Sequence, residues 1–138
     1  MENICFIDNA FFEKNDLTSY AFVGGCDAMI TDYSSIYFDY LLCNKPMAVV
    51  WEDIDEYRQS PGFAVDVDYY LSGAEKVYNI DDFERFIQNL ANGNDELRER
   101  RHEINQWANY ATDGKNASRV VDFIIEKAGL RLTEGNKK

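Results

Sequence analysis

A short run, residues 31–35, carries the side chains best suited to chemistry in this chain. Thr31, Asp32, Ser34 and Ser35 follow a short apolar stretch and precede a segment with an apolar face. Free backbone N–H groups at a helix start carry partial positive charge, and small hydroxyl side chains add hydrogen-bond donors. The layout predicts a strand–turn–helix that binds phosphate.

Local chemistry leaves two interpretations of this run open. In the first, the Ser34 and Ser35 hydroxyls and the backbone amides hold phosphate oxygens. Asp32 would repel phosphate, so it would orient the turn by accepting backbone N–H bonds, or contact a hydroxyl or a metal. In the second, the serines are ordinary helix caps, because Ser and Asp are common capping residues. Taken in isolation, the run favours the ordinary cap.

A second segment, residues 113–119, could face the same anion. It begins with Asp113, Gly114 permits close approach to the backbone, Ser118 offers a hydroxyl, and Arg119 adds positive charge. The alternative is a helix connection with an ordinary cap, which is the more common use of such residues.

Two further side chains could take part in chemistry. Arg58 lies in a segment expected to be an ordered loop, and it could clamp a phosphate or carboxylate with two hydrogen bonds, or simply be solvated. His102 lies within a charged helical run and is expected at the surface rather than as a base.

Hydrophobic patterning predicts the elements that must position these residues. Strands are expected at 3–7, 28–31, 47–51 and 76–78, and helices at 16–25, 34–43, 81–90, 94–110 and 117–128, capped by residues such as Asp16 and Asp81. Residues 52–73 are expected to be irregular. Alternating strands and helices indicate an α/β fold with a parallel sheet, whose ligands bind at the carboxyl ends of the strands. One domain is expected over residues 1–132, followed by a frayed polar tail at 133–138.

Composition limits the classes of function. The chain has 138 residues, 46% of them hydrophobic, and a formal net charge of -11, which argues against nucleic acid as a partner. Cys5, Cys26 and Cys43 lie among apolar residues and are interpreted as buried reduced thiols of a cytoplasmic protein. Their spacing and the single histidine indicate neither a metal site nor another cofactor, and no stretch is long and apolar enough to span a bilayer.

An ordered set of motifs resembles the CDP-glycerol glycerophosphotransferase family, the teichoic-acid primases and polymerases. The resemblance runs from about residue 27 to 128. The matching motifs are residues 27–40, 44–46, 57–58, 62–63 and 113–119.

The resemblance implies a fold and a reaction. The fold would be a partial Rossmann-like parallel sheet with flanking helices, similar to part of the C-terminal domain of a glycosyltransferase-B fold. The reaction would transfer glycerol phosphate or ribitol phosphate from a CDP-linked polyol donor to a membrane-linked polymer acceptor, at the inner face of the cell membrane. By resemblance, the donor-phosphate residues are Thr31, Asp32, Ser34 and Ser35, and the secondary donor-binding residues are Arg58, Asp113, Gly114 and Ser118.

The chain also departs from that family. Family members carry catalytic histidines in a His-Pro motif and in an N-terminal domain, and His102 matches neither. We therefore expect a donor-binding portion with no catalytic residue of its own, inactive alone. Its partner would be a missing N-terminal half or a second copy, and its sheet would be rearranged or dimeric. The alternatives are a fragment of a nucleotide-sugar glycosyltransferase and a non-catalytic interaction module.

Overall fold

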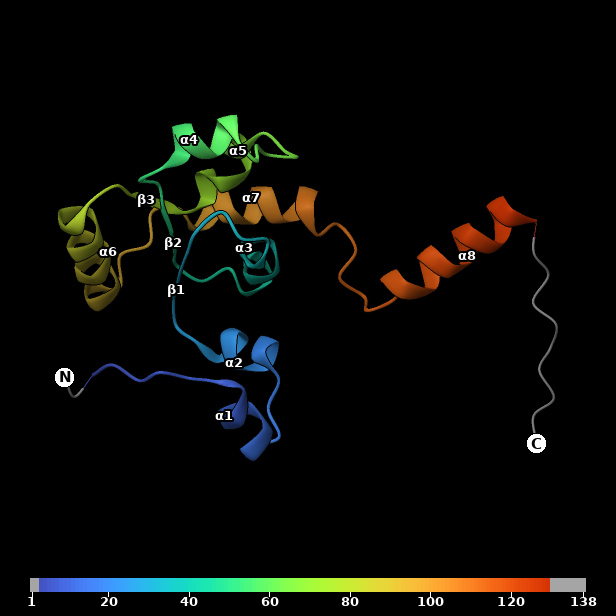
Figure 1. Cartoon of the computed structure of the whole chain (residues 1–138), viewed down its shortest axis with the longest axis horizontal. Coiled ribbons are helices and arrows are strands. Elements are labelled where there is room, and N and C mark those ends of the chain that lie inside the picture. Colours follow the sequence, from blue (N-terminus) through green and yellow to red (C-terminus); the bar gives the residue numbers. More distant parts are fainter. Residues whose placement is uncertain (1–2, 130–138) are drawn as a thin grey trace. The chain divides into compact units, whose positions relative to one another are not determined.

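The computed structural model describes residues 3–129, in two compact units that divide between Ala108 and Asn109 (Figure 1). The first unit holds all three strands of the described chain, and the second holds helix α8 (Asn116–Ala128).

The first unit is built on a parallel sheet in the order β1-β2-β3. Its strands are β1 (Met29–Thr31), β2 (Met47–Val50) and β3 (Glu75–Val77), with Ile30 opposite Ala48 and Val49 opposite Lys76. The central strand is buried over its first three residues, as a continuous apolar run predicts for a strand covered on both faces. The expected α/β fold with a partial Rossmann-like parallel sheet is confirmed.

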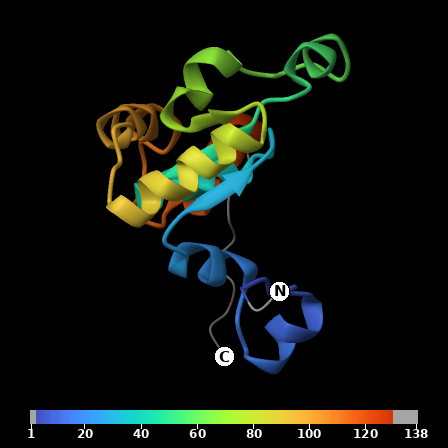
Figure 2. The ribbon, with the colours of Figure 1, turned by 90° about the vertical axis from the view of Figure 1, so that its left-hand side faces the viewer.

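Helices cover both faces of this sheet (Figures 1 and 2). Successive side chains of a strand point to opposite faces, and β2 divides accordingly. Ala48 belongs to the same core cluster as Phe86 of α6, whereas Met47 and Val49 belong to the cluster that contains Ile104 of α7. The helices of this unit are α1 (Asn9–Lys14), α2 (Ser19–Gly25), α3 (Ile36–Tyr40), α4 (Ile54–Gln59), α5 (Val67–Tyr70), α6 (Ile80–Asn92) and α7 (Arg98–Ala108), with single 3-10 turns at Leu41–Cys43 and Leu71–Gly73.

The strand expected at residues 3–7 is wrong. This stretch is irregular and leads into α1, and the side chains of Ile4 and Phe6 are 60% and 95% exposed. A strand needs a neighbour for its backbone hydrogen bonds, and within residues 3–129 β1 pairs with β2 alone. The expected burial of Cys5 fails with the strand, since its side chain is exposed, while Cys26 and Cys43 are partly buried.

Residues 52–73 are more regular than predicted, because they contain α4, α5 and a 3-10 turn. Asp66 caps α5 by accepting the Tyr69 N–H at 3.2 Å. Two helices also begin a few residues away from their predicted starts. Thr18 rather than Asp16 caps α2, and Asn79 rather than Asp81 caps α6.

Candidate functional site

The run at residues 31–35, called here the 31–35 turn, joins the carboxyl end of β1 to α3. Asp32 Oδ1 accepts the Ser34 N–H at 2.8 Å, which is the turn-orienting bond proposed for it from sequence, and the Thr31 hydroxyl lies 3.5 Å from the same oxygen. Ser35 occupies the N-cap position of α3, yet its side chain makes no capping hydrogen bond. The Ser34 and Ser35 side chains are exposed. The ordinary-cap interpretation of Ser35 is therefore not realised.

An aromatic cluster packs beside this turn. It consists of Tyr33, Trp51, Tyr57 and Phe63, with the Tyr33 ring centroid 5.9, 4.9 and 5.3 Å from the other three in that order. The Tyr33 hydroxyl donates to Asp53 Oδ1 at 3.0 Å. Burial, reinforced by this carboxylate, raises the pKa of the Tyr33 hydroxyl well above its usual range, so the group stays protonated and remains a donor.

A groove of about 700 Å³ lies where β1 and β2 end. Five acidic side chains line it, together with Tyr33, Tyr57 and Val50; they are Asp32, Glu52, Asp53, Asp55 and Glu56. This groove lies at the carboxyl ends of the strands, the edge where parallel sheets generally bind ligands. The negative charge of the lining opposes an anionic ligand and suits hydroxyl donors.

Arg58 lies on α4 and points to neighbouring carboxylates. Its guanidinium nitrogens lie 2.6 Å from Asp68 and 3.4 Å from Asp55. Lys76 of β3 approaches the same Asp68 at 3.8 Å. The Arg58 side chain is 40% exposed, and its positive charge is already paired with carboxylates of the same unit.

The second predicted segment, residues 113–119, belongs to the other unit. Asp113 accepts the Lys115 N–H at 3.1 Å, and its two carboxylate oxygens receive hydrogen bonds from Arg119 at 2.8 and 2.7 Å. These bonds lower the pKa of Asp113, and the bonds from Arg119 have the largest effect. Gly114 has φ +72°, which favours glycine, and Ser118 lies exposed in the first turn of α8.

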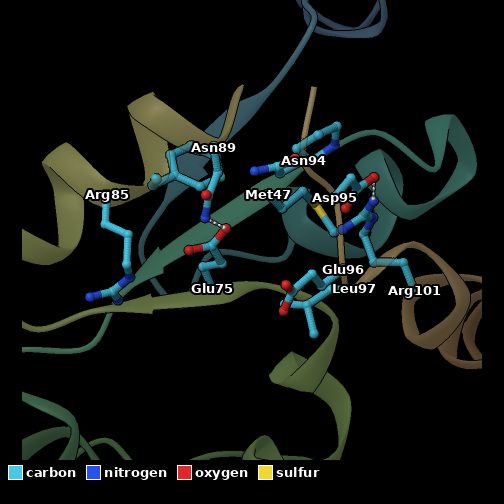
Figure 3. Close-up of a pocket in the computed structure, with 11 residues that line it drawn as sticks. Met47, Glu75, Arg85, Asn89, Asn94, Asp95, Glu96, Leu97 and Arg101 are labelled. Atoms are coloured by element: carbon cyan, nitrogen blue, oxygen red, sulfur yellow. Dashed lines mark hydrogen bonds and ion pairs between the residues drawn. The ribbon is translucent and has the colours of Figure 1, made fainter. Parts of the chain in front are cut away.

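Sequence reasoning missed a pocket of about 380 Å³ at the amino ends of β2 and β3 (Figure 3). Arg101 lines it and is only 1% exposed; it forms an ion pair with Asp95 and donates to the Gly73 carbonyl at 3.4 Å. On the opposite wall, Asn89 donates to Glu75 at 3.2 Å. Arg101 follows charged neighbours in sequence, so no pattern marks it as buried.

His102 is exposed and lies 3.0 Å from the Gln106 amide nitrogen on the same helix. It is a surface residue, as predicted. None of the helices described in residues 3–129 has the length and apolarity needed to cross a membrane.

Residues 8–126 match the family of CDP-glycerol:poly(glycerophosphate) glycerophosphotransferases. The chain belongs to this family, as the motif resemblance predicted.

Two curated relatives show what the chain is similar to. One is a teichoic acid poly(ribitol-phosphate) polymerase of Bacillus spizizenii, 30% identical over 112 residues, or 72% of this chain and 15% of the relative. The other is a teichoic acid ribitol-phosphate primase of the same organism, 28% identical over 98 residues, or 71% of this chain and 24% of the relative. The chain thus spans less than a quarter of either relative. No solved structure is significantly similar to it.

Proposed function

We propose that this chain is the donor-binding portion of a glycerophosphotransferase for a teichoic-acid-like surface polymer. The donor would be CDP-glycerol or another CDP-linked polyol, and the acceptor a membrane-linked polymer, at the inner face of the cell membrane. Family membership carries the proposal. Charge stabilisation of a diphosphate leaving group is the main task of such a site.

The 31–35 turn supports this assignment. Its backbone is already fixed by Asp32, and it presents the Ser34 and Ser35 hydroxyls to solvent beyond the end of β1. Donors that are held in place before binding lose little entropy when a ligand arrives. Thr31 and Asp32 complete the proposed donor-phosphate set, with Arg58 of α4 and, in the second unit, Asp113, Gly114 and Ser118 as secondary positions.

Calorimetry on the full chain tests the proposal. CDP-glycerol and CDP should bind, and the double variant Ser34→Ala/Ser35→Ala should weaken binding about tenfold, since each lost hydrogen bond to a charged oxygen costs on the order of 1 kcal/mol. UDP-sugars in the same titration test the alternative of a nucleotide-sugar enzyme. Absence of binding by the wild-type chain would reject a donor-binding role.

A non-catalytic interaction module is a second candidate, favoured by the acidic groove beside the turn. Its carboxylates repel a diphosphate and attract a basic partner. If the groove serves such a partner, the chain should bind a lysine-rich peptide in low salt while showing no heat with CDP-glycerol.

A further inference from the structure

Tyr33 lies between the residues proposed to contact the donor, yet its side chain makes its contacts elsewhere. Its ring packs on Trp51 after β2, on Tyr57 of α4 and on Phe63 beyond that helix. Tyr57 and Phe63 also stack on each other at 4.8 Å with 30° between the rings. The 31–35 turn is therefore held by segments that follow it by about 20 to 30 residues.

The Tyr33 hydroxyl adds a directed bond to this packing. It donates to Asp53 Oδ1 at 3.0 Å, and Asp53 immediately precedes α4 without capping it through its side chain. The carboxylate is thus used for Tyr33 rather than for its own helix. A hydrogen bond with a charged acceptor is stronger and more directional than a neutral one.

Within the turn, Asp32 accepts the Ser34 N–H, and the Ser34 and Ser35 carbonyls accept N–H bonds from the first turn of α3. Helix α3 has only five residues and its N-cap residue makes no side-chain capping bond, so these local bonds join the turn to a short helix. These bonds are local, and a segment with local bonds alone opens more readily than one that also makes tertiary contacts. The tether through Tyr33 supplies such tertiary contacts.

We propose that Tyr33 is a positioning residue, whose contacts with Asp53 and the aromatic cluster hold the 31–35 turn in the conformation that presents Ser34 and Ser35 to the donor diphosphate. This inference rests on the proposed function. It explains the motif residues Tyr57 and Phe63 as the packing surface for that turn.

The test uses calorimetric titration of the full chain with CDP-glycerol. Tyr33→Phe keeps the ring and loses the hydrogen bond, and it should weaken binding about fivefold. Asp53→Ala removes the acceptor, whereas Asp53→Asn loses the same charge but keeps an acceptor oxygen. Asp53→Asn should therefore bind more tightly than Asp53→Ala, which separates the hydrogen bond from the change in charge.

Tyr40→Phe is the matched control. The Tyr40 hydroxyl donates to the Cys26 carbonyl at 2.9 Å, in the core and outside the 31–35 turn. This variant should lower thermal stability without changing affinity for CDP-glycerol. Amide exchange at Ser34, whose N–H is bonded to Asp32, should accelerate in Tyr33→Phe and stay unchanged in Tyr40→Phe.

The possible outcomes are distinct. If the wild-type chain fails to bind CDP-glycerol, the proposed function and this inference fall together. If it binds and Tyr33→Phe binds equally well, only the positioning role of Tyr33 is overturned. Equal weakening by Tyr33→Phe and Tyr40→Phe would likewise overturn it, because the loss would then reflect general destabilisation.

Discussion

The 31–35 turn and the 113–119 segment share one local hydrogen bond but are stabilised by different kinds of contact. In each, an aspartate accepts the backbone N–H two residues on, Asp32 from Ser34 and Asp113 from Lys115. The first turn is then fixed by tertiary contacts of Tyr33 with an aromatic cluster and Asp53. The second is fixed by an exposed ion pair with Arg119, six residues away on the same segment.

The difference concerns which groups remain for a ligand. In the first turn the tether occupies none of the serine hydroxyls, so they remain available. In the second, Arg119, one of the segment's two cations, is already paired with Asp113. The same local motif therefore leaves exposed hydroxyl donors in one place and forms an aspartate–arginine ion pair in the other.

The largest expected difference is in stability. Tyr33→Ala should lower the free energy of unfolding by about 2 kcal/mol, because it removes a packed ring from the cluster. Phe123→Ala is the matched change in the second unit, where the ring is 58% exposed, and it should cost no more than about 0.5 kcal/mol. Urea denaturation measures both. Equal losses of unfolding free energy in the two variants would contradict the view that tertiary contacts hold the 31–35 turn but not the second unit.

The next comparison concerns the hydroxyls. Ser34→Ala/Ser35→Ala should weaken CDP-glycerol binding about tenfold, whereas Ser118→Ala should weaken it by no more than about threefold, since the second segment is the secondary one. Titration calorimetry provides both values. A larger effect at Ser118 would exchange the roles of the two segments.

A third comparison follows from the lowered pKa of Asp113. Its carboxylate is held charged by Arg119 and by the Lys115 N–H. Because the pKa of Asp113 is lowered, its charged carboxylate stabilises the folded turn at any pH above the ordinary pKa of 3.8. This stabilisation is lost as the pH falls through the lower pKa of the folded state. Carboxyl carbon NMR should show a midpoint below 3.8, and Arg119→Ala should move it upward. An unchanged midpoint in that variant would show that Arg119 is not the cause.

The smallest expected effect concerns charge in the groove. Glu52 lines the same groove as Asp32. Glu52→Gln removes a charge that repels diphosphate and should tighten CDP-glycerol binding about twofold at low salt, with a smaller gain at high salt because ions screen the repulsion. A titration at two ionic strengths checks this. Weaker binding would instead indicate that Glu52 accepts a hydroxyl of the donor.

Much of the sheet was predictable because its signals are local. The apolar run at 47–50 and the helix at 116–128 depend mostly on neighbouring residues, and both were predicted within one residue at each end. The strand at 3–7 failed because pairing partners are not part of a strand's own sequence. Trp107, an apolar residue three positions after the buried Ile104, is 73% exposed, while Arg101 on the same helix is buried. Packing neighbours decide such cases, not periodicity.

By itself the sequence determined the family and the parallel α/β arrangement, and it offered the turn-forming bond of Asp32 as one alternative, because these depend on motifs and contacts within a few residues. Only the tertiary structure decided that Tyr33 reaches Asp53, that Tyr57 and Phe63 pack around it, and that Arg101 is buried. These contacts join residues well apart in the chain, and their geometry follows from how the helices pack on the sheet. The residues of the 31–35 turn could be found by reading the chain, but the support that holds them could not.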